Sequence, residues 1–426
     1  MTFKKNKRNL WIIACIFVFL VAAVSVLYIF RGFTSHTLNV KEAGAKGDGI
    51  HDDTAAFMKV LKYAADLKSR NEVHVIVPPG TYLIDVKESL PLLSNVHIQG
   101  IDYPVLKFAP LSTEQHGYEA FMISGHNIGI EGIVIDGSNR LIRGVGIHTG
   151  SSRVQINNSM IQRISQGDDP DSPFYSAVVS GIMIYGRTHD ITISASKIRD
   201  IKAIHDQPVS RGIMVLYEDG EPIAKRIRIS ANEISHIAPK EDADGIFFDT
   251  APPNSPLSES VIENNAIHHS AKRGIKIAAP GVTIRNNRIT NSFSGNNPYL
   301  FPATAPIPQD MYSAISVYAS HVTLSGNVIN GIGSFYSAIE VDSGPLSHIT
   351  IQGNDISVKA GDRTRSNRAK STGIRLGDIS QYQIINNKIS NVETAIRLAE
   401  SPEDTEGKIN ENQFDNVDII IQYLDQ

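Results

Sequence analysis

The amino-acid sequence predicts an all-β fold, a right-handed parallel β-helix with one N-terminal capping helix and one transmembrane helix before it. Three observations support this fold class. A short phrase, a small residue followed by Ile, recurs along most of the chain, and a polar residue follows the copies at a constant phase. After residue 70 the sequence has short strand-like runs separated by turns and lacks helical periodicity. These features are typical of a solenoid built from strands.

The N-terminal segment has the pattern of a membrane anchor. Lys4, Lys5, Lys7 and Arg8 precede an uncharged apolar run over residues 10–30, and a run of about 20 apolar residues spans a bilayer as a helix. The basic flank stays on the cytoplasmic side. We therefore expect a cytoplasmic basic segment (1–9), a transmembrane signal anchor (10–30), a spacer (31–37) and an extracellular β-helix (38–426). Cleavage as a signal peptide, with secretion of the β-helix, is the alternative.

The repeated phrase sets the coils of the predicted solenoid. Its copies lie roughly 22–40 residues apart, which is the range of solenoid repeats. Each copy is expected to bury its Ile in one coil, whose backbone pairs with neighbouring coils about 4.8 Å away. The copies are Gly146-Ile147, Gly181-Ile182, Gly212-Ile213, Gly245-Ile246, Gly274-Ile275, Ala314-Ile315, Ala338-Ile339, Gly373-Ile374 and Ala395-Ile396.

A column of small polar residues accompanies these copies in fixed phase. Stacked Asn side chains can hydrogen-bond to one another and satisfy their buried amides, so the column predicts an internal ladder. Turn-favouring Asn in unrelated loops would not keep a constant phase. The column comprises Ser159, Ser196, Asn232, Asn265, Asn287, Asn327, Asn354, Asn387 and Asn412.

The start of the solenoid needs a cap, and the sequence provides a candidate. Asp53-Thr54 is expected to cap a helix over residues 55–65, with an apolar face that includes Phe57 and Leu61. Cys15 is the only cysteine, so the chain forms no intramolecular disulfide. The net charge of -4 gives no reason to expect a nucleic-acid partner.

Two motifs at this end resemble the pectate-lyase-like superfamily of β-helix proteins. LNVKEAGAKGDGIHDDTAAFMKVL (38–61) resembles its opening motif of a strand, a Gly-Asp-Gly turn and an Asp-Asp-Thr helix cap. VIVPPGTYLI (75–84) resembles the first coil that follows. The superfamily includes pectate lyases, polygalacturonases and phage tailspike depolymerases. The resemblance therefore implies a polysaccharide substrate more strongly than a particular reaction, and it implies a structural role for Asp48, Asp52 and Asp53.

The candidate site is expected on one outer face of the solenoid. Residues next to the inward Ile point to solvent, and insertions over 166–180, 201–211, 236–244, 291–312 and 358–372 each precede a repeat strand. Loops gathered at one corner can form the wall of a groove. The outward column one past Ile comprises His148, Met183, Met214, Phe247, Lys276, Ser316, Glu340, Arg375 and Arg397.

The cations on this face favour a lyase. β-Elimination from a uronic-acid polymer needs a base, often Lys or Arg in this superfamily, and a cation that neutralises the carboxylate. Arg273, Lys276 and Arg211 are the candidates for base and carboxylate clamp, and Tyr318 is the candidate proton donor to the leaving oxygen. Clustered carboxylate oxygens suit Ca²⁺, and the candidate ligands are Asp242, Asp244 and Asp249.

A glycoside hydrolase is the first alternative. EDADGIFF (241–248) resembles the Asn-Thr-Asp-Gly strand of polygalacturonases at Asp244, but Lys272-Arg273 stands where their Asp-Asp pair follows. Glu340 and Asp342 are two residues apart on one strand, roughly 7 Å, and could supply a substitute pair. The residues expected to bind substrate are Arg211, Asp249, Glu340 and Arg375.

A non-catalytic protein that binds glycans or assembles exopolysaccharide is the second alternative. In that case Arg273 beside Asp244, and Arg375 beside Glu340, are surface ion pairs worth about 0–1 kcal/mol each. Four further cations, Arg363, Arg365, Arg368 and Lys370, lie in the insertion that precedes Arg375, which favours an acidic glycan as the partner. The sequence leaves the oligomeric state open.

Overall fold

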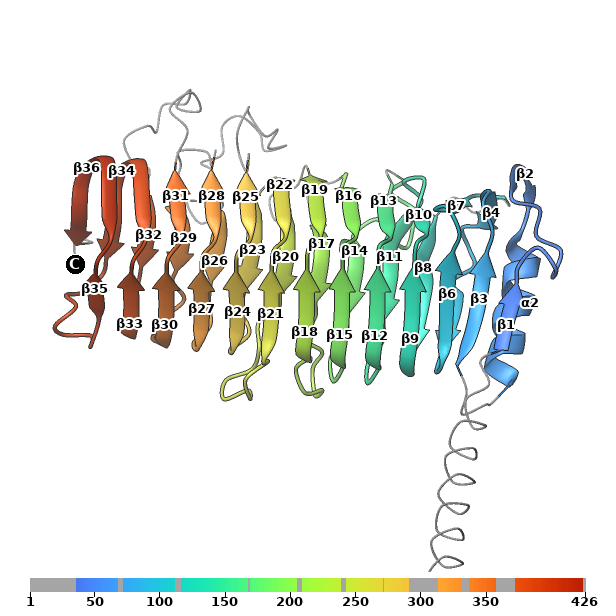
Figure 1. Ribbon diagram of the computed structural model, residues 1–426, viewed down its shortest axis with the longest axis horizontal. Helices are drawn as coiled ribbons and strands as arrows, with labels where there is room; N and C mark the ends of the chain where they lie inside the picture. Colours follow the sequence, from blue (N-terminus) through green and yellow to red (C-terminus); the bar gives the residue numbers. More distant parts are fainter. Residues whose placement is uncertain are drawn as a thin grey trace, which may run out of the picture.

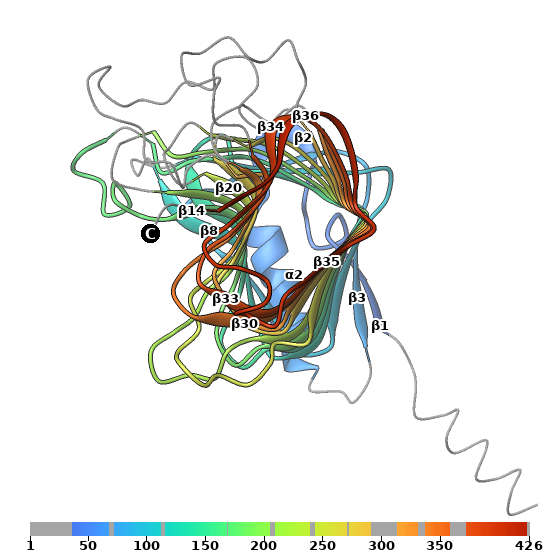
Figure 2. The ribbon, with the colours of Figure 1, turned by 90° about the vertical axis from the view of Figure 1, so that its left-hand side faces the viewer.

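Parallel pairing between successive coils builds a long stack of strands with α2 (Thr54–Asp66) at its N-terminal end (Figure 1). The structure is a computed structural model that describes residues 36–67, 72–111, 116–167, 169–204, 209–238, 243–270, 272–290, 313–330, 337–357 and 372–423. Seen along the long axis, the strands superpose as three faces, and α2 lies across the far end (Figure 2). The predicted parallel β-helix is confirmed.

The first face is a separate sheet in which every strand pairs in parallel with the next coil. Its strands are β1 (His36–Asn39), β3 (Val73–Val77), β6 (Val96–Gly100), β9 (His126–Glu131), β12 (Ser152–Asn157), β15 (His189–Ser194), β18 (Lys225–Ser230), β21 (Ser260–Glu263), β24 (Val282–Arg285), β27 (Val322–Ser325), β30 (Leu346–Gln352), β33 (Ile379–Ile385) and β35 (Lys408–Asn410).

The second face follows the first in each coil. Its strands are β2 (Asp48–Asp52), β4 (Thr81–Asp85), β7 (Val105–Ala109), β10 (Val134–Asp136), β13 (Met160–Ile164), β16 (Lys197–Lys202), β19 (Glu233–Ala238), β22 (Ala266–Ser270), β25 (Arg288–Thr290), β28 (Val328–Asn330), β31 (Asp355–Ser357) and the first parts of β34 (Lys388–Leu398) and β36 (Gln413–Tyr423).

The third face completes the coil and carries the repeated Ile phrase. Because β34 and β36 bend from the second face into the third, the two faces form one continuous sheet. The strands of the third face are β5 (Leu90–Leu93), β8 (Gly117–Ser124), β11 (Leu141–Ile147), β14 (Val179–Ile184), β17 (Ser210–Val215), β20 (Asp244–Phe248), β23 (Arg273–Ile277), β26 (Ile315–Val317), β29 (Ser337–Val341), β32 (Thr372–Leu376) and the second parts of β34 and β36.

The repeated Ile side chains stack inside the solenoid as predicted. Ile182, Ile213, Ile246 and Ile275 pair in register from coil to coil and are 0% exposed, and the same column continues to Ile396. Full burial of one such side chain contributes about 1.5–3 kcal/mol. The first copy was wrongly placed, because Val145, not Ile147, pairs with Ile182. Gly146 therefore occupies the outward column of Met183, to which His148 had been assigned, and His148 lies two residues further along the chain.

The polar column forms the predicted ladder. The backbone N–H and the Nδ2 of Asn265 donate to Oδ1 of Asn287 at 3.0 and 2.9 Å, and Asn287 donates in the same way to Asn327. Nδ2 of each Asn also donates to a backbone carbonyl of a preceding coil, for example that of Ile262. The amides that turn each coil are therefore satisfied without water.

The N-terminal cap is confirmed with one correction. The apolar face of α2, including Phe57 and Leu61, is buried on the end of the solenoid. Asp53 occupies the N-cap position, but its side chain makes no capping bond to the helix. Its carboxylate accepts from the backbone N–H groups of Lys46 and Gly47 at 2.5 and 3.1 Å, so it fixes the preceding turn instead. Asp53 therefore has the structural role that the resemblance implied.

No helix within the described residues is long and apolar enough to cross a membrane. The predicted anchor at 10–30 lies outside those residues.

The insertions all occur where a second-face strand leads into a third-face strand, for example between β13 and β14. The described strands on either side of each insertion thus meet at the same corner of the coil, while the insertions over 291–312 and 358–371 lie outside the described residues.

We expect removal of one rung of the ladder to destabilise the fold. Asn287→Ala deprives the N–H of Asn265 and the carbonyl of Ile262 of their partners, and each unsatisfied buried group costs about 1–3 kcal/mol. The midpoint of urea denaturation should fall accordingly. Thr283→Ala, on the outer surface of the same coil, is the control and should change stability by less than about 0.5 kcal/mol. Equal effects of the two variants would contradict a stabilising ladder.

Candidate functional site

The predicted site residues come together on the outer surface of the third face. In register, Arg211, Asp244 and Arg273 occupy one column, and Phe247, Lys276, Ser316, Glu340 and Arg375 occupy a second. A glycine between the two columns in β17, β20 and β23 lets the coils approach closely. A Cβ on Gly245 would lie only 2.6 Å from the carbonyl oxygen of Gly274. The two columns lie on one surface despite the spacing of three residues, because Arg211 contacts Phe247 and Arg273 contacts Ser316.

Asp244 lies between two arginines. Its Oδ2 is 3.4 Å from Nη1 of Arg211, and its Oδ1 is 3.5 Å from Nη1 of Arg273. All three side chains are almost fully buried, Asp244 at 0% exposure and Arg273 at 1%. Breaking such a buried pair by removing one partner is costly, because the remaining charge stays in a medium of low polarity. Arg273 is therefore better suited to position its neighbours than to accept a proton from a substrate.

Arg273 connects this triad to a hydroxyl-rich segment. Its Nε donates to Oγ of Ser316 at 3.0 Å, and its Nη2 donates to the Tyr318 hydroxyl at 3.3 Å. The Tyr318 hydroxyl donates in turn to Oε2 of Glu340 at 3.2 Å. Burial raises the pKa of Tyr318, although Arg273 opposes the shift, so the phenol keeps its proton and can donate it.

Glu340 and Asp342 form a pair of carboxyl groups with different surroundings. Burial raises the pKa of Glu340, although Arg375 and Arg273 oppose the shift, whereas the Asp342 side chain is 33% exposed. Nη1 of Arg375 lies 3.5 Å from Oε1 of Glu340 and also contacts Oδ2 of Asp342. Two carboxyl groups in different surroundings are the kind of pair that glycoside hydrolases use as acid and base.

Lys276, like Arg375, is a partly exposed cation of the set. Its ammonium lies 4.8 Å from the centre of the Phe247 ring and 5.9 Å from that of Tyr318. Such cation–π contacts hold an ammonium over aromatic rings. We call the set formed by Arg211, Asp244, Arg273, Lys276, Ser316, Tyr318, Glu340, Asp342 and Arg375 the arginine–carboxylate network.

Of the three predicted Ca²⁺ ligands, the structure describes Asp244 and Asp249. Asp242 lies outside the described residues, and the carboxylate of Asp244 faces two guanidinium groups. Asp249 accepts from the backbone N–H groups of Tyr217 and Thr250. Within the described ranges, no three His, Cys, Asp or Glu side chains gather closely enough to hold a metal ion. Ca²⁺ binding therefore stays a prediction that depends on Asp242.

A second polar cluster on the same face was missed by sequence reasoning. We call this set the tyrosine–histidine cluster. It comprises Tyr118, Glu119, Arg143, His148 and Tyr185, which come from β8, β11, β14 and the residues that follow them. Arg143 donates to both tyrosine hydroxyls, and Nε2 of His148 is 2.7 Å from Oε1 of Glu119. Arg143 lies in the column of Arg211 and Arg273, a relation hidden by the misplaced first repeat. If the first repeat had been placed at Gly144-Val145, Arg143 would have been assigned to this column.

An apolar stripe separates the two sets. Met183, Met214 and Phe247 lie in the same outward column and form a buried cluster with Tyr185. Arg211 is stacked over the ring of Phe247 at 4.7 Å, which joins the stripe to the arginine–carboxylate network. The outer surface of the third face thus changes along the solenoid from polar and aromatic, through apolar, to strongly charged.

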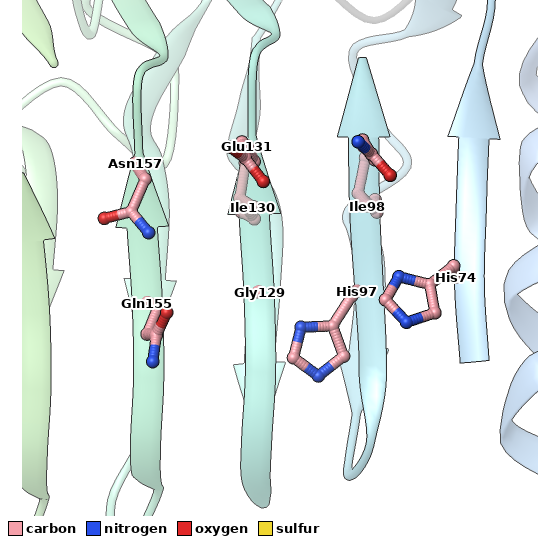
Figure 3. A pocket seen from close by; sticks show the side chains of 9 residues that line it. His74, His97, Ile98, Gly129, Ile130, Glu131, Gln155 and Asn157 are labelled. Atoms are coloured by element: carbon pink, nitrogen blue, oxygen red, sulfur yellow. The ribbon is translucent and has the colours of Figure 1, made fainter. Parts of the chain in front are cut away.

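A cavity of about 280 Å³ lies elsewhere, on the outer surface of the first face (Figure 3). His74 and His97 line it with their rings stacked 5.5 Å apart. Gly129 lies opposite His97 and leaves room for its ring, because a Cβ there would be 2.4 Å from Nδ1. Burial lowers the pKa of His97, so its imidazole is neutral near neutral pH. The described residues that line this cavity include no member of the predicted site.

Comparison with known families supports the fold and places the chain among carbohydrate-related proteins. Residues 37–297 match the sequence profile of the family described as rhamnogalacturonase A/epimerase, pectate lyase-like. The chain belongs to this family. The match covers the solenoid from its first strand to just beyond β25 and so includes Asp244, Arg273 and Lys276.

Two curated relatives share shorter segments with this family member. It is 30% identical over 177 residues to the SPbeta prophage-derived uncharacterized protein YomE of Bacillus subtilis, covering 39% of this chain and 24% of that protein. It is 40% identical over 76 residues to the plasmin and fibronectin-binding protein A of Streptococcus pneumoniae, covering 18% of this chain and 10% of that protein. The chain thus spans at most about a quarter of the length of these relatives.

Two solved structures share the fold over most of the chain. The surface adhesin PfbA of Streptococcus pneumoniae superposes with a TM-score of 0.67 at 18% identity, covering 91% of this chain and 93% of that one. The A-module of the mannuronan C-5 epimerase AlgE4 of Azotobacter vinelandii gives 0.61 at 17% identity, covering 91% and 98%. At these identities the likeness establishes the parallel β-helix.

We expect the stability of the fold to depend on pH through Glu340. The pKa of Glu340 is raised above 4.5, so the folded chain binds this proton more tightly than the unfolded chain. The resulting stabilisation is fully present below about pH 4.5 and is lost as pH rises through the raised pKa. The unfolding free energy of Glu340→Gln, which stays neutral, should therefore fall less than that of the wild type across this window.

Urea denaturation at a series of pH values measures this difference. The exposed residue Glu88 provides the control, because Glu88→Gln removes a carboxylate without changing a buried group. Parallel stability profiles for the wild type and Glu340→Gln would contradict a raised pKa.

Proposed function

We propose that the protein is an extracellular, membrane-anchored lyase that cleaves an acidic polysaccharide by β-elimination. One observation carries the proposal: Lys276 and Arg273 both contact Tyr318 on the third face, and all three residues were assigned to this reaction from the sequence. A proton acceptor, a proton donor and a source of positive charge are therefore available at one place.

The charges of the arginine–carboxylate network favour an anionic ligand. Four cations, Arg211, Arg273, Lys276 and Arg375, accompany three carboxyl groups, and the raised pKa of Glu340 favours the neutral form of one of these carboxyls. A net positive potential above a surface of low polarity attracts a uronate and stabilises the charge that develops during proton removal. Membership of the pectate-lyase-like family also supports a polysaccharide substrate.

The reaction assigns one step to each group. Lys276 first releases its own proton to solvent and then, as the free amine, removes the proton from the carbon that bears the carboxylate. The electron pair forms a carbon–carbon double bond while the adjacent glycosidic carbon–oxygen bond breaks. The phenol of Tyr318 gives its proton to the departing oxygen. Arg273 holds the Tyr318 hydroxyl in place and, with Arg211, supplies the positive field for the carboxylate.

Hydrolysis is the second candidate, because one observation favours it specifically. Glu340 and Asp342 differ in exposure and share Arg375, so two carboxyl groups in different surroundings lie within reach of one glycosidic bond. In this case Asp342 activates water and Glu340 protonates the leaving oxygen. The two reactions yield different products from the same polymer.

We expect Lys276→Ala to lower kcat by at least about 100-fold, the usual contribution of a positioned acid or base. The full chain in detergent is incubated with acidic and neutral polysaccharides, with Ca²⁺ or chelator. Unsaturated ends are followed by ultraviolet absorbance and all new ends by reducing-sugar assay. Lys197→Ala, an exposed lysine on the second face, is the matched control and should retain full activity.

The products decide between the candidates. Reducing ends without absorbance, lost in Asp342→Asn and retained in Lys276→Ala, would contradict the lyase and favour the hydrolase. Binding without cleavage of any polymer would contradict both and favour a glycan-binding protein. Loss of activity with chelator and its return with Ca²⁺ would support the predicted metal.

The membrane anchor is part of the proposal and has a separate test. We expect the full chain to sediment with membranes and its β-helix to be digested by protease added to intact cells. Phe19→Arg puts a charge in the middle of the apolar run, which costs about 2.5–3.5 kcal/mol for insertion and should reduce the membrane-bound fraction. Protection of the β-helix in intact cells would contradict an extracellular location.

A further inference from the structure

The cavity on the first face lies apart from the arginine–carboxylate network. Its lining residues come from β3, β6, β9 and β12, close to the N-terminal cap, whereas the network extends from β17 to β32 on the third face. Its volume of about 280 Å³ is near the lower end of the roughly 300–1,000 Å³ that small-molecule pockets occupy. The cavity therefore has room for one small ligand that the proposed reaction does not involve.

Gly129 forms the floor of this cavity, because it has no side chain. Along the outer surface, His74, His97, Gly129 and Gln155 follow one another in register, so the glycine leaves a gap in their column. Figure 3 shows the His97 ring leaning from β6 toward Gly129, with Gln155 on the opposite side. The ring fills only part of the gap, since the cavity still reaches Gly129 and Gln155. These two side chains are its facing walls.

A rim of polar side chains lies two residues further along the same strands, about 7 Å from the first column. Gln99, Glu131 and Asn157 are in register there, and the first two are exposed. Within the part of the chain that the structure describes, the side chains of Gln99, Glu131 and Gln155 make no hydrogen bond or ion pair. Oδ1 of Asn157 accepts from Ser194 at 2.5 Å, and Figure 3 shows its nitrogen on the side of β9. The rim is therefore available to a ligand.

The charge of the lining determines the class of ligand. Glu131 supplies a carboxylate, and no lysine or arginine is among the described residues that line the cavity. His97 adds no positive charge near neutral pH, because burial lowers its pKa. Nε2 of His74 lies 3.7 Å from Oε2 of Glu72, so a proton that His74 gains is balanced by that carboxylate. A negative field of this kind repels uronates and phosphates and attracts a cation.

The remaining lining groups indicate a ligand with hydroxyl groups. The carboxamides of Gln99, Gln155 and Asn157 supply N–H donors, and the two glutamines also supply acceptor oxygens, which matches hydroxyls that both donate and accept. The His97 side chain is 24% exposed and presents the apolar body of its ring beside them. A sugar ring has hydroxyl groups and an apolar face of C–H groups. A sugar that also carries an ammonium group would pair with Glu131 as well.

We propose that the cavity on the first face binds an amino sugar whose nitrogen is a free ammonium group. The ammonium group pairs with Glu131, the hydroxyl groups pair with the carboxamides, and the sugar ring lies over Gly129 against His97. N-acetylation would remove the charge and add bulk in a small cavity. The protein thus has two glycan-binding surfaces of opposite charge, and the anionic one holds the solenoid to a glycan that contains unacetylated amino sugars.

Direct binding tests this site without relying on cleavage. Saturation-transfer NMR is carried out at about pH 6.5, where the sugar amine is protonated, on the full chain in an uncharged detergent without a sugar head group. The probes are the methyl glycosides of glucosamine, N-acetylglucosamine, glucose and glucuronic acid. We expect the glucosaminide to bind at least ten-fold more tightly than the other three.

Two variants separate the charge of the site from its shape. Glu131→Gln should raise the Kd of the glucosaminide at least ten-fold, to that of the methyl glucoside. Gly129→Ala retains the charge but places a Cβ 2.4 Å from Nδ1 of His97, so it displaces the ring and should raise the same Kd at least ten-fold. Glu259→Gln, an exposed glutamate just before β21 on the same face, is the matched control and should not change it.

Glu131 is exposed, so Glu131→Gln tests the proposal even if Gly129→Ala does not fold. Equal binding of the four glycosides, or an unchanged Kd of the glucosaminide in Glu131→Gln, would overturn the site. Nα-acetyl-lysine amide carries an ammonium group without a sugar ring and should bind at least ten-fold more weakly than the glucosaminide. Tighter binding of this lysine derivative would contradict an amino sugar as the ligand.

The outcomes also separate this site from the proposed lyase. Glucosaminide binding that is lost in Glu131→Gln, without cleavage of any polymer, would support the site and contradict the lyase. Cleavage of an acidic polymer without glucosaminide binding would support the lyase and overturn the site.

Discussion

The constraint on which this molecule depends is the constant register between coils. Each residue of a face lies about 4.8 Å from its equivalents above and below, so a position is chosen for a whole column. Apolar columns such as that of Ile246 become a continuous core, and the Asn287 column becomes a ladder. Alternation favours a charged column, because like charges directly opposite one another are destabilising unless each finds another partner. Arg211, Asp244 and Arg273 follow this rule.

The same constraint makes function harder to recognise than fold. Alternating Arg and Asp on a β-helix would be expected from stacking alone, so the buried triad around Asp244 is weak evidence for catalysis. Groups that stacking does not require are more informative. The contact of Lys276 with Tyr318 adds reactive capacity without evident benefit to the stack, so it carries the proposed function.

Sequence reasoning succeeded where a pattern repeats and failed where two patterns overlap. The copies from Ile182 onward were placed correctly because one inward Ile follows one small residue. In Gly144-Val145-Gly146-Ile147 both Val145 and Ile147 face inward, so the phrase fits at two positions. A Cβ added at Gly144 would meet the same kinds of atoms as one added at Gly181, an Ile side chain and a glycine carbonyl. This match identifies Gly144 as the equivalent of Gly181, and it is visible only in the structure. Asp53 similarly has the right residue type for a cap but turns to the preceding loop.

Both polar sets lie on strands or on the residue that directly follows one, which has a mechanical consequence. Their backbone atoms are held by pairing on both sides, so the relative position of the two sets is fixed by the solenoid rather than by loops. Arg375 and Arg397 illustrate the precision of this arrangement: they are stacked in register, yet Arg375 turns to Glu340 and Arg397 turns to Gln422. A rigid surface of this kind suits a repeating polymer, because columns several coils apart can match the spacing between the sugar residues of that polymer.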